Sequence, residues 1–73
     1  MKVLVLGSGG REHAIVWALK RTSRESLQLY CAPGNAGIAE VARCVPIATS
    51  SHALLTEFVR AESIDVTIVG HLE

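Results

Sequence analysis

The chain begins with a short apolar run that ends in a glycine cluster, and this junction constrains the fold more than any other feature. Residues 2–6 read KVLVL, and Gly7, Gly9 and Gly10 follow directly. A continuous apolar run rich in β-branched residues is typical of a strand buried on both faces of a parallel sheet. Glycines at its end permit the tight turn into a helix that such folds need. The junction therefore predicts the first strand, turn and helix of an α/β domain.

The rest of the chain alternates between strand and helix patterns. Further strands are expected over three apolar runs, at 27–32, 44–48 and 65–70. Pro46 indicates that the third strand lies at an edge, because proline cannot donate a ladder hydrogen bond. Helical spacing marks 11–21 and the segment after Ser50 or Ser51, a candidate N-cap. The residues expected to face the core from these helices are Ala14, Ile15, Ala18, Leu19, Leu54, Leu55, Phe58 and Val59.

This alternation predicts an α/β half-Rossmann layer. Parallel βαβ units cross over with a right hand, which gives a four-stranded parallel sheet of order 3-2-1-4 with helices on both faces. In that order the GSGG turn, the PGNAG segment at 33–37 and the end of TIVG should meet at one crevice. Ligands of open α/β sheets bind there, outside the carboxyl ends of the strands.

Composition narrows the class of partner. Seven basic residues balance seven acidic ones among 73 residues, so no overall field favours nucleic acid or an anionic membrane. No run approaches the roughly 20 apolar residues that cross a bilayer, and the start lacks a secretory pattern. Cys31 and Cys44 have neither disulfide-framework nor zinc-site spacing. We expect one small cytoplasmic domain with two buried thiols, no metal site and a small-molecule ligand.

The glycine turn is suited to an anion, because the helix after it offers unpaired N–H groups. The dinucleotide pattern GxGxxG would place a third glycine where this chain has Glu12, whose carboxylate would repel a pyrophosphate. No acidic residue ends the second strand to bind a ribose hydroxyl. A sugar monophosphate therefore fits better than a dinucleotide. Glu12 could cap the helix from position N3 or contact the ligand, and Arg11 could face the anion or solvent.

Three short segments of the sequence form one recognisable pattern. GSGGREHA at 7–14 is followed by APGNAG at 32–37 and IDVTIVG at 64–70. In this order and spacing they resemble the N-terminal domain of the glycinamide ribonucleotide synthetases, also called phosphoribosylamine–glycine ligases. The resemblance implies a pre-ATP-grasp domain of a ligase of de novo purine synthesis. Such a ligase joins glycine to 5-phosphoribosylamine and uses ATP with Mg²⁺ (or Mn²⁺).

The resemblance also implies that this chain carries a ribose-phosphate site and that the other domains carry out catalysis. The site residues that it implies are Gly9, Gly10, Arg11, Glu12, Pro33, Gly34, Asn35 and Gly37. The chain should contribute no catalytic residue and act only with the remaining ATP-grasp domains. The family usually continues from its fourth strand as Gly-Pro-Glu, whereas Gly70 here precedes His71-Leu72-Glu73. We therefore expect a domain over 1–70 and a tail over 71–73 that derives from cloning. A non-catalytic dinucleotide- or nucleotide-binding module and a purely structural docking module are the alternatives.

Overall fold

The computed structural model describes residues 1–22 and 26–69. Its elements, in chain order, are β1 (Lys2–Gly7), α1 (Gly10–Thr22), β2 (Gln28–Pro33), the 3₁₀ turn η1 (Ile38–Glu40), β3 (Arg43–Cys44), α2 (His52–Ala61) and β4 (Val66–Val69). All strand pairs are parallel, and the sheet order is β3-β2-β1-β4. The α/β class and the 3-2-1-4 order expected from the sequence are confirmed. Gly70 and the expected tail over 71–73 lie outside the described residues.

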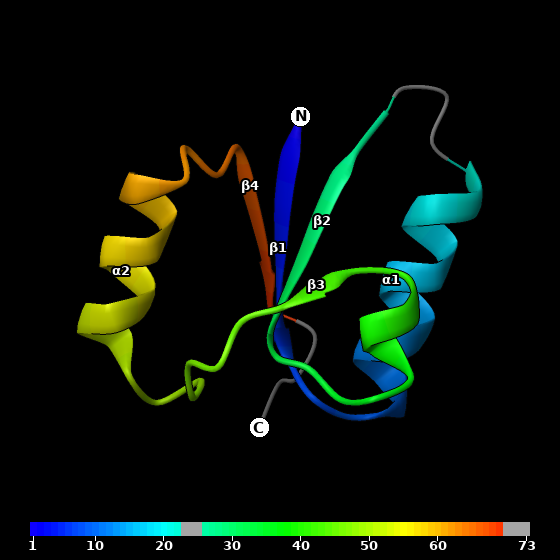
Figure 1. Cartoon of the computed structure of the whole chain (residues 1–73), viewed down its shortest axis with the longest axis horizontal. Coiled ribbons are helices and arrows are strands. Elements are labelled where there is room, and N and C mark those ends of the chain that lie inside the picture. Colours follow the sequence, from blue (N-terminus) through cyan, green and yellow to red (C-terminus); the bar gives the residue numbers. More distant parts are fainter. Residues whose placement is uncertain (23–25, 70–73) are drawn as a thin grey trace.

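The sheet forms the middle layer, with α1 on one face and α2 on the other (Figure 1). Strand β1 supplies both cores because its side chains alternate between the faces. Val3 and Val5 pack with Val16 of α1, whereas Leu4 packs with Leu55 of α2. On the α2 side, the rings of Tyr30 and Phe58 meet edge to face at 5.6 Å between centroids. Two helices and a central buried strand thus fix the sheet from both sides.

The third strand is shorter than its apolar run suggests. Only Arg43–Cys44 pairs with β2, although the apolar run extends over 44–48. The backbone N–H of Val45 still donates to the carbonyl of Cys31 at 2.8 Å. Pro46 follows and has no N–H to continue the ladder, so the pairing stops there. The edge position was predicted correctly, but the expected strand length was wrong.

The buried face of α1 also differs from the expected one. Val16 is fully buried, and Ile15 and Leu19 pack against the core, whereas Ala14 and Ala18 are exposed. The face is rotated because Glu12 lies on the buried side, where a backbone N–H satisfies its carboxylate. A helical pattern of apolar residues does not predict a charged residue at this buried position. On α2, Leu54 is likewise exposed, whereas Leu55 is buried as expected.

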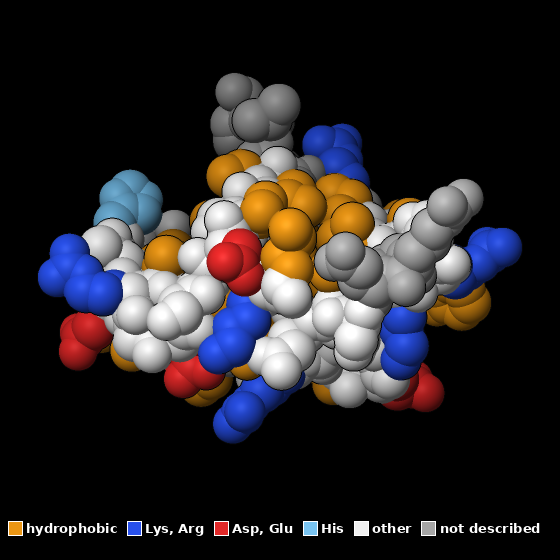
Figure 2. Space-filling view, turned by 90° about the horizontal axis from the view of Figure 1, so that it is seen from above, with side chains coloured by type: hydrophobic (Ala, Val, Ile, Leu, Met, Phe, Trp, Pro, Cys, Tyr) orange, Lys and Arg blue, Asp and Glu red, His pale blue; other side chains and the backbone are white. Residues whose placement is uncertain are grey.

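The two ends of the sheet differ in character. Figure 2 shows the end formed by the amino ends of the strands, where apolar side chains gather centrally and charged side chains of both signs surround them. The glycine turn and the other loops that follow the strands lie at the opposite end (Figure 1). The mixture of charges in Figure 2 agrees with the balanced composition. Ligands of open α/β sheets bind at this carboxyl end of the strands.

Candidate functional site

The turn between β1 and α1 is built around Gly7 and Glu12. Gly7 has φ +135°, a conformation that side chains with a Cβ rarely adopt. A Cβ at Gly7 would also stand 2.5 Å from Cδ and 2.6 Å from Oε1 of Glu12. Only glycine fits between the end of β1 and this carboxylate. The turn therefore requires glycine for its backbone conformation and for its space.

Glu12 makes one of the two bonds of a capping box, the one from position N3 back to the N-cap. The N–H of Gly9 donates to Oε1 of Glu12 at 2.8 Å, and the carbonyl of Gly9 accepts from the N–H of His13 at 3.1 Å. Gly9 is thus the N-cap and Glu12 occupies position N3. Glu12 is 5% exposed. Capping, one of the two roles considered from the sequence, is present in the structure, and contact with a ligand stays a prediction.

The PGNAG segment is joined to the glycine turn by hydrogen bonds. The N–H of Gly34 donates to the carbonyl of Gly7 at 3.0 Å, and Nδ2 of Asn35 donates to the carbonyl of Ser8 at 2.7 Å. The other amide atom of Asn35, Oδ1, accepts from the N–H of Ile38 at 2.9 Å, where η1 begins. Both ends of this amide are therefore engaged within the chain. The two loops that the sequence placed in one crevice do lie together.

The thiols of two cysteines donate hydrogen bonds to these loops. Sγ of Cys31 donates to the carbonyl of Gly7 at 3.3 Å, and Sγ of Cys44 donates to the carbonyl of Asn35 at 3.5 Å. Burial, with smaller contributions from Cys44 and Glu12, which repel a thiolate, raises the pKa of the Cys31 thiol to about 11. The Cys31 thiol therefore stays protonated and can donate. Cys31 is buried as expected, whereas Cys44 is only partly buried.

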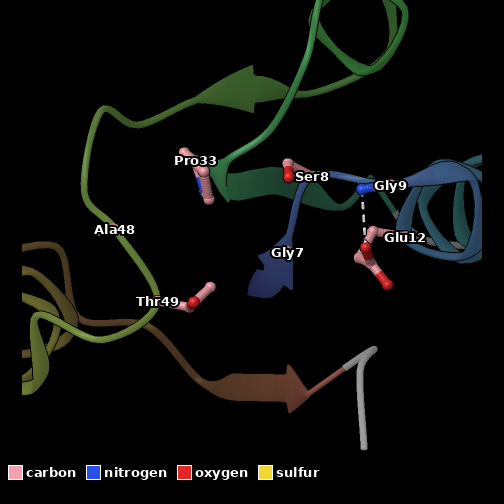
Figure 3. Close-up of a pocket in the computed structure, with 7 residues that line it drawn as sticks. All are labelled: Gly7, Ser8, Gly9, Glu12, Pro33, Ala48 and Thr49. Atoms are coloured by element: carbon pink, nitrogen blue, oxygen red, sulfur yellow. Dashed lines mark hydrogen bonds between the residues drawn. The ribbon is translucent and has the colours of Figure 1, made fainter.

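A crevice of about 420 Å³ opens beside this turn (Figure 3). This volume lies within the roughly 300–1,000 Å³ range of small-molecule sites. The lining residues are Gly7, Ser8, Gly9, Glu12, Pro33, Ala48 and Thr49. The Gly7–Glu12 turn forms one side, and residues from the connection between β3 and α2 stand opposite.

The crevice includes part of the site expected from the sequence. Gly9, Glu12 and Pro33 line it. The expected residues that do not line it are Gly10, Arg11, Gly34, Asn35 and Gly37. Arg11 is exposed on the first turn of α1, and Gly37 lies against His13, whose Cε1 would be 2.8 Å from a Cβ at that glycine. Gly34 has φ +73° and faces Cys44.

Four lining residues were absent from the expected site. Gly7 and Ser8 belong to the quoted glycine motif, and their place within it was the available signal. Ala48 and Thr49 come from the connection that follows β3. Their only signal was their position after a strand, since loops at the carboxyl ends of parallel strands share one edge of the sheet.

Neither a metal cluster nor a membrane span is found in the part of the chain that the structure describes. Within 1–22 and 26–69, no three His, Cys, Asp or Glu side chains come together as metal ligands would. Over the same ranges, no helix has the length and apolar character needed to cross a bilayer.

Comparison with known proteins identifies the family. The family described as Phosphoribosylglycinamide synthetase, N domain, matches residues 1–73. The chain belongs to this family. Its match extends over the GSGG turn, the PGNAG segment and all four strands. The resemblance drawn from the GSGGREHA and APGNAG motifs is confirmed.

Relatives in the phosphoribosylglycinamide synthetase family share this region. The phosphoribosylamine–glycine ligase of Caldanaerobacter subterraneus is 54% identical over 70 residues, and that of Rhizobium meliloti is 49% identical over 70. Each match covers 96% of this chain and 16% of the relative. The crystal structure of the Thermotoga maritima phosphoribosylamine–glycine ligase superposes with a TM-score of 0.72 at 28% identity, over 97% of this chain and 16% of that chain. The chain thus spans about one sixth of the length of these relatives.

Proposed function

We propose that this chain is the N-terminal, substrate-side domain of a cytoplasmic ATP-dependent ligase that joins glycine to 5-phosphoribosylamine in purine biosynthesis. The observation that carries the proposal is the crevice beside the GSGG turn, in a chain whose family is named for this synthetase. The ligases of Caldanaerobacter and Rhizobium support it, because they are 54% and 49% identical to this chain over 96% of its length. The role of the domain is to bind and orient the ribose phosphate part of the amine.

The chemistry of the crevice walls suits such a substrate. Beside the crevice, the first turn of α1 leaves the N–H groups of Gly10 and Arg11 without intrahelical partners, and such groups can donate to oxygen atoms of the ligand. Glu12 is fixed by its bond to Gly9, so its carboxylate presents a preorganised acceptor to ribose hydroxyls or to the amine. Arg11 would approach the ligand from the rim. Gly34 and Asn35 act indirectly in this proposal, because their hydrogen bonds hold the neighbouring loop against the turn. Gly37 lies against His13 of α1.

The remaining domains of the ligase supply the bond-forming step. ATP, when bound there with Mg²⁺ or Mn²⁺, activates the glycine carboxylate. Glu12 is the sole carboxylate among the residues that line the described crevice, and it is already bonded to Gly9. These residues do not make a metal clamp, so we assign ATP and the metal to the other domains. The 73-residue chain alone positions substrate and catalyses nothing.

A dinucleotide-binding module is the alternative, and Glu12 weighs against it. Its side chain occupies the space beside Gly7 and brings a negative charge to the position where a pyrophosphate would bind. Titration of the chain with NAD, followed by amide chemical shifts, tests this alternative directly. Micromolar binding with shifts at 7–12 would favour it over the ligase domain.

A domain exchange tests the proposed function. Residues 1–69 of this chain would replace the matching segment of the Caldanaerobacter ligase, with which it shares 54% identity. We expect ADP formation that depends on both glycine and phosphoribosylamine, the latter formed in the assay from ribose 5-phosphate and ammonia. The unmodified ligase and reactions lacking either substrate are the controls. A folded hybrid that binds ATP but forms no product would refute the proposal.

A further inference from the structure

We propose that Thr49 contacts the phosphate end of the sugar phosphate bound in the crevice. The inference rests on the proposed function and assigns a direction to the ligand within the same crevice. Thr49 lies on the connection between β3 and α2, outside the motifs that the sequence singled out. It is therefore a second, independent wall of the site.

Thr49 and Glu12 lie at opposite ends of the crevice. Figure 3 shows Gly7 between them, with the side chain of Thr49 directed toward Gly7 and Glu12 beyond Gly9 on the other side. Both residues line the same cavity of about 420 Å³. A ligand that fills the cavity therefore has one end near the hydroxyl of Thr49 and the other near the carboxylate of Glu12.

Charge favours one orientation of a sugar phosphate. The carboxylate of Glu12 repels a phosphate group, and it offsets the positive end of the α1 dipole from position N3. The groups that this carboxylate attracts are hydrogen-bond donors, namely ribose hydroxyls and an amine. The phosphate is therefore favoured at the opposite end, beside Thr49.

The Thr49 end can accept this anion. Among the hydrogen bonds formed within 1–22 and 26–69, the hydroxyl of Thr49 takes part in none, so it can donate to a phosphate oxygen. The N–H of Ser51 donates to the carbonyl of Ala48 at 3.0 Å, which folds the connection so that Thr49 lies within a turn. The first turn of α2, which starts at His52, contains no acidic residue. This end of the crevice therefore lacks the opposing charge present at the Glu12 end.

A ligand titration of the 73-residue chain tests the assignment. Amide shifts would be followed against ribose 5-phosphate and against ribose, in the wild type and in Thr49→Val, Thr49→Ser and Thr67→Val. Thr49→Val keeps the shape and removes the hydroxyl, and Thr49→Ser restores it. Thr67→Val makes the same change at an exposed position on β4, away from the crevice. We expect Thr49→Val to weaken ribose 5-phosphate binding about tenfold or more, the effect of losing one hydrogen bond to a charged group.

The other variants and the ribose titration test which end of the ligand lies beside Thr49. Thr49→Ser and Thr67→Val should stay within about threefold of the wild type, and ribose binding should not respond to Thr49→Val. Equal affinity of wild type and Thr49→Val for ribose 5-phosphate would overturn the assignment, as would weakened binding of ribose. A wild-type chain without shifts at about 50 mM ribose 5-phosphate would also overturn it. The domain exchange reports separately on the proposed function, since its product formation does not require the isolated chain to bind.

Discussion

Replacement of Gly7 by alanine should destabilise the chain more than any other single methyl added to the glycine turn. Gly7→Ala places a Cβ at φ +135° and 2.5 Å from Cδ of Glu12. The backbone strain costs about 1–3 kcal/mol. Displacement of Glu12 also breaks its bond to the N–H of Gly9, and a bond to a charged group contributes about 1.5–3 kcal/mol. We expect a loss of about 3 kcal/mol in the free energy of unfolding.

This loss is large for a chain of 73 residues. A single core of this size rarely supplies more than about 3–5 kcal/mol, so Gly7→Ala should leave a substantial unfolded population at 25 °C. Urea unfolding followed by far-ultraviolet circular dichroism measures the change. Gly10→Ala is the matched control, because a Cβ there meets nothing within 4 Å and Gly10 is the first helical residue of α1. That variant should gain about 0.5–1 kcal/mol.

A double-mutant cycle separates the two causes. Glu12→Ala alone removes the capping bond, whereas in the Gly7→Ala background it also removes the atoms that clash. The loss in free energy of unfolding caused by Glu12→Ala should therefore be smaller by at least about 1 kcal/mol in the Gly7→Ala chain than in the wild type. Additive effects of the two substitutions would refute the steric argument. A Gly7→Ala chain within about 0.5 kcal/mol of the wild type would refute both the steric and the conformational argument.

Four further predictions concern the loops and the thiols. Gly34→Ala should lower the free energy of unfolding by about 2 kcal/mol, because the backbone has φ +73° and the new Cβ would contact Sγ of Cys44. Adding Cys44→Ala to this variant should restore only the steric part, and urea midpoints measure both changes. Asn35→Ala should cost about 1–3 kcal/mol through loss of two hydrogen bonds, with Asn35→Asp recovering only the acceptor, and equal midpoints for all three chains would contradict this. Iodoacetamide should modify Cys44 before Cys31, as mass spectrometry would detect, because the pKa of Cys31 is raised to about 11. Since that thiol ionises at a higher pH in the folded chain than the ordinary 9.0, it should make stability fall as the pH rises from about 9 to about 11, and Cys31→Ala should reduce this fall.

Local sequence determined most of the architecture. KVLVL is too apolar for a strand with a solvated face, so it requires helices on both sides, and α1 and α2 occupy those positions. The right-handed crossover rule then left one order for four parallel strands. The errors arose where one residue outweighed an apolar pattern. Pro46 shortened β3, and the buried carboxylate of Glu12 rotated α1.

The site was less predictable than the fold. The glycine turn carries its own signal, because positive φ and close packing select glycine at identifiable positions such as Gly7. Asn35 and Gly34 were correctly placed beside that turn, but their hydrogen bonds run within the chain. Thr49 carries no local signal. Its place opposite the turn depends on where β3 ends and how the connection folds back toward α2, and both are tertiary properties.

Glu12 connects the departure from the dinucleotide pattern to the shape of the crevice. A glycine at this position would leave the space beside Gly7 open, whereas the Glu12 side chain fills it and bonds to Gly9. Capping and ligand contact, which the sequence presented as alternatives, are therefore compatible: the cap holds Oε1 in place while the carboxylate still lines the cavity. A fixed negative group at one end and an uncharged hydroxyl at the other give the crevice a polarity that a glycine would not. That polarity suits a ligand with one anionic end and one end rich in hydrogen-bond donors, which describes a phosphoribosyl amine better than a dinucleotide.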